Sequence, residues 1–317
     1  MGTQRAIDGR IRSLPDEYYG SQGDIAGAKS ARSIEIRHEL SYEAFIRDYV
    51  RKKRPVVVKD VVSKDSITPE VLRELSGHRP LADLAGGGGS RFLVRGRASS
   101  IDKFNSLSTL GDYLTHFASD DADLPYLTNL CVSVNFPEVA DAFAPPRYFE
   151  SNWSSKWPFS ALAFEQSSRV GSEVFISPKG GTYGVLHYDR HAQFLGTCQY
   201  FGKKLWWLCP PEQSEYLYPV AGGYPFVSPV NPFDPDLKTF PLFERVKPFV
   251  VTLEAGDLMF VPSLWWHMTK AITPNISTLH RIINRHNLGA YLWDLRQYLM
   301  HDRRLLLGAL RQLILGK

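Results

Sequence analysis

The sequence predicts a mainly β fold, a sandwich or barrel of short strands with flanking helices at both ends. From about residue 172, apolar strand-like runs such as "SEVFIS" and "LMFV" alternate with turns rich in Gly and Pro. Apolar residues at helical spacing come before this region, in 41–55, and after it, in 287–317. A chain of 317 residues that is 44% hydrophobic and 22% charged can bury a large core without covalent cross-links.

The first 170 residues predict an α/β extension ahead of the barrel. Residues 1–33 are polar and rich in Gly, Ser and Arg, so we expect a flexible arm there. The helix predicted in 41–55 ends at Pro55, and a short buried strand follows in "PVVVKDVV". Two more helices are predicted, one in "TPEVLRELSG" with Thr68 as N-cap and Pro69 in its first turn, and one in "SIDKFNSLSTLGDYLTHFAS".

Two later segments have more than one interpretation. Residues 212–245 form a long Pro-, Tyr- and Phe-rich connection between strands, which predicts a lid, a binding loop or a packed cover. The C-terminal segment 287–317 carries an apolar stripe at helical spacing that something must cover. The stripe packs either on the chain's own barrel or in a homodimer interface, and we favour the dimer.

Composition excludes several classes of protein. The three cysteines are widely spaced and form no CxxC, which argues against a disulfide framework or a thiolate zinc site and fits a reducing compartment. No apolar run approaches the length of a membrane span, and "MGTQRAIDGRIRSLPDEYYG" lacks the apolar core of a signal peptide. We therefore expect a cytoplasmic protein. The net charge of +4 is spread along the chain, so nucleic acid is not an expected partner.

Metal-binding residue types occur in "GVLHYDRHAQF" and in "EAGDLMFVPSLWWHMTKAI". In a strand, His187 and Asp189 point to the same side, and His267 opens a later strand that can lie beside them. Two imidazoles and one carboxylate leave coordination positions open, which is typical of the facial triad of non-haem Fe(II) oxygenases. A zinc site and a purely structural pairing on one strand face are the alternatives.

Five motifs occur in an order that points to one family: "RPVVVKDVV", "PYLTN" at 125–129, "HYD", "FGKKLWWLCPPEQSEYLYP" and "GDLMFVPSLWWH". Over roughly residues 36–286 the chain resembles the JmjC/cupin-like branch of Fe(II)/2-oxoglutarate-dependent oxygenases. It is most similar in pattern to the asparaginyl hydroxylase of hypoxia-inducible factor and related JmjC hydroxylases. The resemblance implies a double-stranded β-helix, a jelly-roll barrel with the metal at its mouth. That places an oxygenase domain at 34–286, with its barrel core at about 172–286.

The resemblance also implies roles for individual residues. The residues that match the family's iron ligands are His187, Asp189 and His267. Lys204 matches the lysine that pairs with the distal carboxylate of the cosubstrate 2-oxoglutarate, with Lys203 as its rival, and Tyr126 matches a tyrosine that donates to the same carboxylate. The family's threonine is Gly184 here, so Thr182 or Tyr183 takes its place, and Asn284, with Asn287 as competitor, stands near a family asparagine beside the metal.

The activity implied is hydroxylation of an unactivated C–H bond with Fe(II), 2-oxoglutarate and O2, releasing succinate and CO2. The expected substrate is an amino acid, a peptide or a small natural product. Protein side-chain hydroxylation, N-demethylation, and a non-catalytic or other-metal cupin are the alternatives. Candidate substrate contacts are His191, Gln193, Arg281 and Tyr224. Three of them also have a structural interpretation: His191 as a barrel-mouth residue, Arg281 as part of a solvated rim and Tyr224 as a loop-packing residue.

Overall fold

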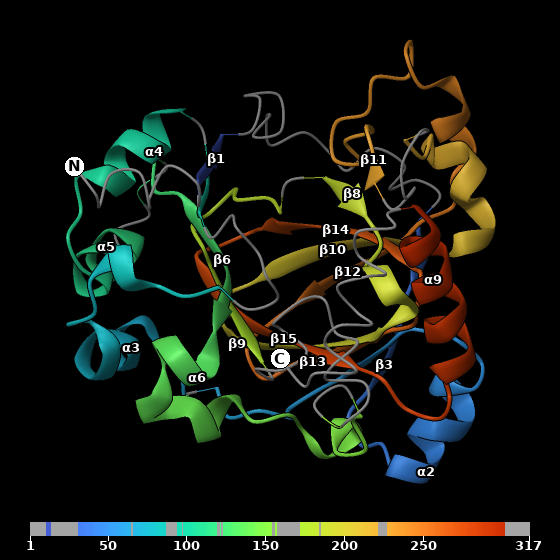
Figure 1. The fold of residues 1–317 in the computed structure, drawn as a ribbon, viewed down its shortest axis with the longest axis horizontal. Helices are drawn as coiled ribbons and strands as arrows, with labels where there is room; N and C mark the ends of the chain where they lie inside the picture. The colour runs from blue at the N-terminus through green and yellow to red at the C-terminus, as the bar shows by residue number, and fades with distance from the viewer. Residues whose placement is uncertain are drawn as a thin grey trace.

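The computed structural model of the chain describes residues 11–13, 31–64, 66–86, 94–96, 98–118, 121, 123–153, 156, 172–183, 185–220 and 227–301. Within these residues the strands form two mixed sheets, and helices flank them (Figure 1). Helices α3 to α6 gather beside β6, while α2 and α9 lie on the opposite side of the barrel (Figure 1). This is the jelly-roll architecture that the sequence predicts.

Among the described residues, the larger sheet has nine strands and the smaller sheet has six. The order in the larger sheet is β1 (Ile11–Ser13), β5 (Val94–Gly96), β6 (Tyr126–Cys131), β7 (Glu173–Ser177), β15 (Asn275–Ile282), β9 (Phe194–Phe201), β13 (Leu258–Val261), β4 (Val56–Val58) and β3 (Glu35–Arg37). The order in the smaller sheet is β11 (Val227–Ser228), β8 (Leu186–His187), β14 (Trp266–Ala271), β10 (Lys204–Cys209), β12 (Phe249–Leu253) and β2 (Arg32–Ser33).

The helices and helical turns are short, apart from the last one. The α-helices are α2 (Tyr42–Phe45), α3 (Pro69–Ser76), α4 (Ala98–Asn105), α5 (Leu110–Ala118), α6 (Val132–Asn135) and α9 (Leu288–His301). The 3-10 segments are η4 (Leu81–Asp83), η5 (Pro137–Phe143), η6 (Arg147–Phe149), η7 (Arg190–Ala192), η8 (Pro211–Leu217) and η9 (Pro241–Arg245), and η3 (Ile46–Val50) continues α2 as a π-helix.

Two predicted helices show how side-chain caps set their ends. In α3, Thr68 is the N-cap and its hydroxyl accepts the Val71 N–H, as predicted. The segment 100–119, predicted to be helical, contains two helices, α4 and α5. The Thr109 hydroxyl accepts the Asp112 N–H, and the Asp112 carboxylate accepts the Thr109 N–H in return. This reciprocal cap begins a new helix within the apolar periodicity.

Other predicted segments also contain short structured elements. Strands β1 and β2 fall inside residues 1–33, and β2 pairs in parallel with β12. The long connection at 212–245 contains η8, β11 and η9, while its residues 221–226 lie outside the described part of the chain. No helix among the described residues has both the length and the apolar character needed to cross a bilayer.

Strand alternation sends the side chains of β10 into different environments. Lys204 and Trp206 lie on one face, which lines a pocket between the two sheets. Trp207 and Cys209 lie on the other face and join an apolar cluster with Leu217 and Phe243 beneath η8 and η9. Gly202, with φ of +68°, makes the tight turn before β10, and a Cβ there would clash with the Pro274 carbonyl.

Candidate metal centre and ligand pocket

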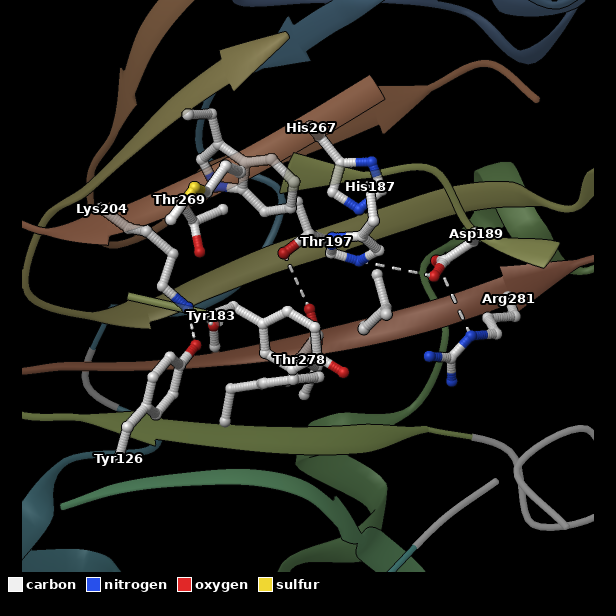
Figure 2. A pocket seen from close by; sticks show the side chains of 15 residues that line it. Tyr126, Tyr183, His187, Asp189, Thr197, Lys204, His267, Thr269, Thr278 and Arg281 are labelled. Atoms are coloured by element: carbon white, nitrogen blue, oxygen red, sulfur yellow. Dashed lines mark hydrogen bonds and ion pairs between the residues drawn. The ribbon is translucent and has the colours of Figure 1, made fainter. Parts of the chain in front are cut away.

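The strand register brings the two candidate histidines together. β8 and β14 pair antiparallel with His187 directly opposite His267, so both imidazoles leave the same face of the sheet. Their ring centroids lie 4.4 Å apart. One ligand atom from each of His187, Asp189 and His267 lies within 4.8 Å of the other two. Among the described residues these three form the candidate metal cluster (Figure 2).

Both imidazoles are held by the same kind of backbone contact. His187 Nδ1 lies 2.8 Å from the Val185 carbonyl, and His267 Nδ1 lies 3.0 Å from the Trp265 carbonyl. A carbonyl accepts only, so each Nδ1 carries the proton and each Nε2 keeps its lone pair for a metal. Such an outer contact fixes both tautomer and ring orientation.

The carboxylate ligand follows β8 in extended backbone, with φ of −73° and ψ of 134° at Asp189. Its Oδ1 lies 3.9 Å from His187 Nε2, whereas its Oδ2 lies 3.8 Å from Arg281 Nε (Figure 2). The two oxygens therefore face different partners. Burial lowers the pKa of His267, although the nearby Asp189 carboxylate opposes this shift. His267 is thus neutral near pH 7, as a metal ligand must be.

A small pocket, with a cavity volume of about 40 Å³, lies beside the triad between the two sheets. The smaller sheet contributes His187, Lys204, Trp206, His267, Met268 and Thr269 to its lining. The larger sheet contributes Tyr126, Phe175, Thr197, Ser277, Thr278, Leu279 and Arg281.

Lys204 lies in the wall of this pocket, away from the triad (Figure 2). It is only 3% exposed, and its Nζ donates to Ser277 Oγ at 2.5 Å and to Tyr126 Oη at 3.3 Å. No carboxylate of the described residues forms an ion pair with it. Burial alone lowers the pKa of Lys204 to about 7. Its rival Lys203 lies at the surface, where it pairs with Glu254.

The triad and Lys204 suit a metal and an acidic ligand, respectively. The triad offers two nitrogens and one oxygen from one side, an arrangement that leaves positions free for a bound ligand. At the other end, a buried ammonium with only hydroxyl partners lacks a counter-ion, which an anionic group would supply. The donor set therefore fits a divalent metal together with a ligand that carries a carboxylate at its far end.

Two predicted cosubstrate residues do not line the pocket. Thr182 bridges to Lys270 outside the lining, while its neighbour Tyr183 does line the pocket. Asn284 lies beyond the end of β15, where its side chain accepts the His286 N–H. Asn287 donates to the carbonyls of Ala192 and Ile282, just ahead of α9.

Of the four predicted substrate residues, only Arg281 is among the described residues that line the pocket. His191 and Gln193 are buried outside the lining, and His191 packs against Tyr291 of α9. Tyr224 lies outside the described residues.

Sequence reasoning missed several hydroxyl residues of the pocket, among them Ser277 and Thr197. Ser277, Leu279 and Arg281 alternate along β15 and face the pocket together. That period of two is visible in "NISTLHRI" and is the signal that could have found Ser277.

Known proteins match this chain over the same region. A sequence model of the Cupin-like domain family matches residues 42–284, which include the triad and Lys204. The 2-oxoglutarate and iron-dependent oxygenase JMJD4 of Gallus gallus is 31% identical over 169 residues, covering 53% of this chain and 38% of that protein. JMJD4 of Homo sapiens is 26% identical over 308 residues, covering 92% of this chain and 72% of that protein.

A second group of relatives matches a shorter stretch. HSPB1-associated protein 1 of Bos taurus is 33% identical over 142 residues, covering 42% of this chain and 29% of that protein. The aligned stretch thus covers less than two fifths of the length of the Gallus and Bos relatives. The family match spans most of the chain and contains the whole barrel core. The chain therefore belongs to the Cupin-like domain family, and its relatives include proteins named 2-oxoglutarate and iron-dependent oxygenases.

Proposed function

We propose that this chain is an Fe(II)- and 2-oxoglutarate-dependent dioxygenase that hydroxylates an unactivated C–H bond of an amino acid, a peptide or a small natural product. The observation that carries the proposal is the position of Lys204. A buried ammonium without a carboxylate partner lies in the same pocket as a two-histidine, one-carboxylate cluster. A dicarboxylate that also binds the metal fits both ends of this pocket.

The far end of the pocket binds and orients the cosubstrate. Lys204 Nζ, once protonated, pairs with the distal carboxylate, and a charge-assisted contact of this kind is stronger than a neutral hydrogen bond. Tyr126 Oη and Ser277 Oγ already contact Nζ, so they hold the ammonium in place and offer hydroxyl donors to the same carboxylate. Phe175 packs edge-to-face against Tyr126 at this end of the pocket.

The near end holds the metal. His187 and His267 present Nε2, and Asp189 presents one carboxylate oxygen from the same side. When bound, iron, 2-oxoglutarate and O2 supply the oxidising chemistry that places a hydroxyl group on carbon, with release of succinate and CO2. The chain's own contribution is to orient these groups and to hold the C–H bond of the substrate near the triad. Arg281, Tyr183 and Leu279 line the same pocket as the triad.

The test is anaerobic addition of Fe(II) and then 2-oxoglutarate to the purified protein, followed by visible absorption. Bound cosubstrate is expected to give the weak metal-to-ligand charge-transfer band that the family resemblance implies. His187→Ala should abolish the band, and Lys204→Ala should weaken it by raising the dissociation constant for 2-oxoglutarate.

The chain offers a matched control for this experiment. Lys203→Ala removes the neighbouring lysine, which points to the surface, and should leave the band and the affinity unchanged. A wild-type protein that binds Fe(II) but gives no band with 2-oxoglutarate would rule the proposal out. That result would favour a cupin that uses its metal in another way.

A further inference from the structure

Arg281 and Glu173 form an ion pair in the wall of the pocket, beside the metal cluster. Glu173 on β7 lies opposite Leu279 of β15, so Arg281 is its diagonal neighbour on the same face. Arg281 Nη1 donates to Glu173 Oε2. Glu173 is 1% exposed, and the Arg281 side chain is largely buried. A buried pair of this kind is weak evidence for stability, because desolvation of both charges offsets their attraction.

The same guanidinium reaches the candidate metal carboxylate. Arg281 Nε lies 3.8 Å from Asp189 Oδ2, while Asp189 Oδ1 faces His187 (Figure 2). One cation therefore stands between two carboxylates. The ion pair with Arg281 is made by Oδ2, and Oδ1 is the oxygen that lies 3.9 Å from His187 Nε2.

The oxygen of Glu173 that accepts from Arg281 also accepts a second hydrogen bond. Asn129 Nδ2 donates to Glu173 Oε2 at 3.2 Å, and Tyr183 Oη donates to Asn129 Oδ1 at 3.2 Å. The Tyr183 ring lies 5.2 Å from the His187 ring. A closed circuit of contacts thus runs from His187 through Asp189, Arg281, Glu173, Asn129 and Tyr183 back to His187.

An irregularity in β6 places Asn129 in this circuit. The register between β6 and β7 shifts between Leu127 and Leu130, and Asn129 has φ of 55°. Asn tolerates this left-handed conformation better than most residues, and such bulges redirect side chains. The backbone is therefore locally distorted at the residue that holds Glu173.

Charge balance explains why both members of the pair are needed. A lone guanidinium beside Asp189 would compete with a divalent metal for that carboxylate. Glu173 neutralises Arg281, so Arg281 can orient Asp189 without drawing it from the metal. A lone Glu173 would in turn be a second buried carboxylate without a cation.

We propose that Arg281 and Glu173 are positioning residues that fix Asp189 as a one-oxygen metal ligand. This inference rests on the proposed function only in assuming that the triad binds a divalent metal. It assigns Arg281 to the orientation of Asp189 rather than to direct contact with substrate.

The experiment is a Co(II) titration of metal-free protein, followed by visible absorption in competition with a chelator. Glu173→Gln and Arg281→Met should each weaken Co(II) binding by about 10- to 100-fold, the range seen when outer partners of metal ligands are removed. At saturation, the Co(II) bands of Arg281→Met should change shape, because Asp189 can then offer both oxygens. Those of Glu173→Gln should change because the remaining guanidinium, no longer neutralised, draws Asp189 from the metal. Thermal unfolding of the metal-free proteins is measured in parallel.

Lys59→Met is the matched control, since it breaks another ion pair with a buried carboxylate, Lys59–Asp257, outside the pocket lining. It should lower the unfolding temperature and leave both the Co(II) affinity and the spectrum as in the wild type. The double variant Glu173→Gln/Arg281→Met should regain stability over either single variant, because no lone buried charge remains. Its Co(II) affinity should stay low.

Two different results would separate the two hypotheses. If the wild type fails to bind Co(II), or His187→Ala binds it equally well, the metal site itself is wrong and so is the proposed function. If the wild type binds Co(II) and the folded Glu173 and Arg281 variants match its affinity and spectrum, the positioning role is overturned while the metal site stands. An equal loss of affinity in Lys59→Met would overturn it too.

Discussion

The backbone N–H of His191 donates to Asp294 Oδ2 at 2.5 Å, which ties helix α9 to the segment that follows the candidate metal carboxylate. His191 and Ala192 have φ of 67° and 47°, in the left-handed region that such residues rarely adopt. The Ala192 carbonyl accepts from Asn287 Nδ2 and from Ser263 Oγ. Hydrogen bonds from Asp294, Asn287 and Ser263 thus hold the strained turn that follows Asp189.

Removing the hydrogen bond between Asp294 and His191 should lower the stability of the fold. Asp294→Ala should lower the free energy of unfolding by about 1–3 kcal/mol, because a charge-assisted hydrogen bond is lost and the buried N–H of His191 loses its acceptor. The measurement is urea unfolding monitored by tryptophan fluorescence. Asp294→Asn keeps an acceptor oxygen and should retain most of the stability. Equal losses in the two variants would contradict this account.

The affinity for 2-oxoglutarate should fall as pH rises through the pKa of Lys204. Burial lowers this pKa to about 7 in the free protein, so the ammonium that pairs with a carboxylate is present below about pH 7 and lost above it. Binding near pH 8 should therefore take up a proton. Calorimetry in buffers of different ionisation enthalpy measures this uptake, and Lys204→Met should abolish it. Binding without proton uptake near pH 8 would show that the ammonium is already charged.

The same lysine should make stability depend on pH. Its folded pKa of about 7 lies below the unfolded value of 10.5, so between these values the unfolded state binds more protons. The free energy of unfolding is then expected to rise with pH across this window. The destabilisation caused by burying the charged ammonium is fully present below about pH 7. Lys204→Met should stabilise the protein by at most about 5 kcal/mol below pH 7 and by progressively less toward pH 10. Thermal unfolding across this pH range measures the difference.

The C-terminal helix leaves apolar side chains at the surface. Tyr291 and Leu295 of α9 are buried against the chain's own fold, while Leu292 is 48% and Trp293 is 57% exposed. We propose that this exposed face contributes to a homodimer. Analytical ultracentrifugation should then show a concentration-dependent dimer that Leu292→Ser/Trp293→Ser shifts to monomer. Leu237→Ser, at another exposed leucine, is the control, and a wild type that is monomeric at all concentrations would contradict the proposal.

Motif chemistry and strand alternation predicted the centre of the site. The i, i+2 spacing placed His187 beside Asp189. Lys204, the first residue of β10, lines the pocket, whereas the preceding Lys203 lies at the surface. The jelly roll followed from the strand pattern together with the family resemblance. Each of these predictions depends on local periodicity or on a short motif, which a single sequence displays directly.

Other parts could not be read from the chain. Asn284 was predicted as a cosubstrate contact, but β15 ends at Ile282 and Asn284 is not among the described residues that line the pocket. The end of a strand depends on tertiary pairing, which a single sequence does not display. The contact between Asp294 and His191 joins residues 103 positions apart, and no local pattern reports it. Likewise, the break between α4 and α5 depends on a polar cap that apolar spacing conceals.

The Nδ1 contacts of His187 and His267 mean that the imidazoles are aligned before any ion arrives. A preorganised site of two nitrogens and one oxygen discriminates poorly among divalent ions. Its affinities for them follow the Irving–Williams order. Nickel, copper or zinc should therefore displace iron wherever they are abundant. The metal found in a purified sample would then reflect the growth medium rather than the physiological ion. Since no refolding is needed, chelation followed by reloading with iron should restore a mismetallated sample.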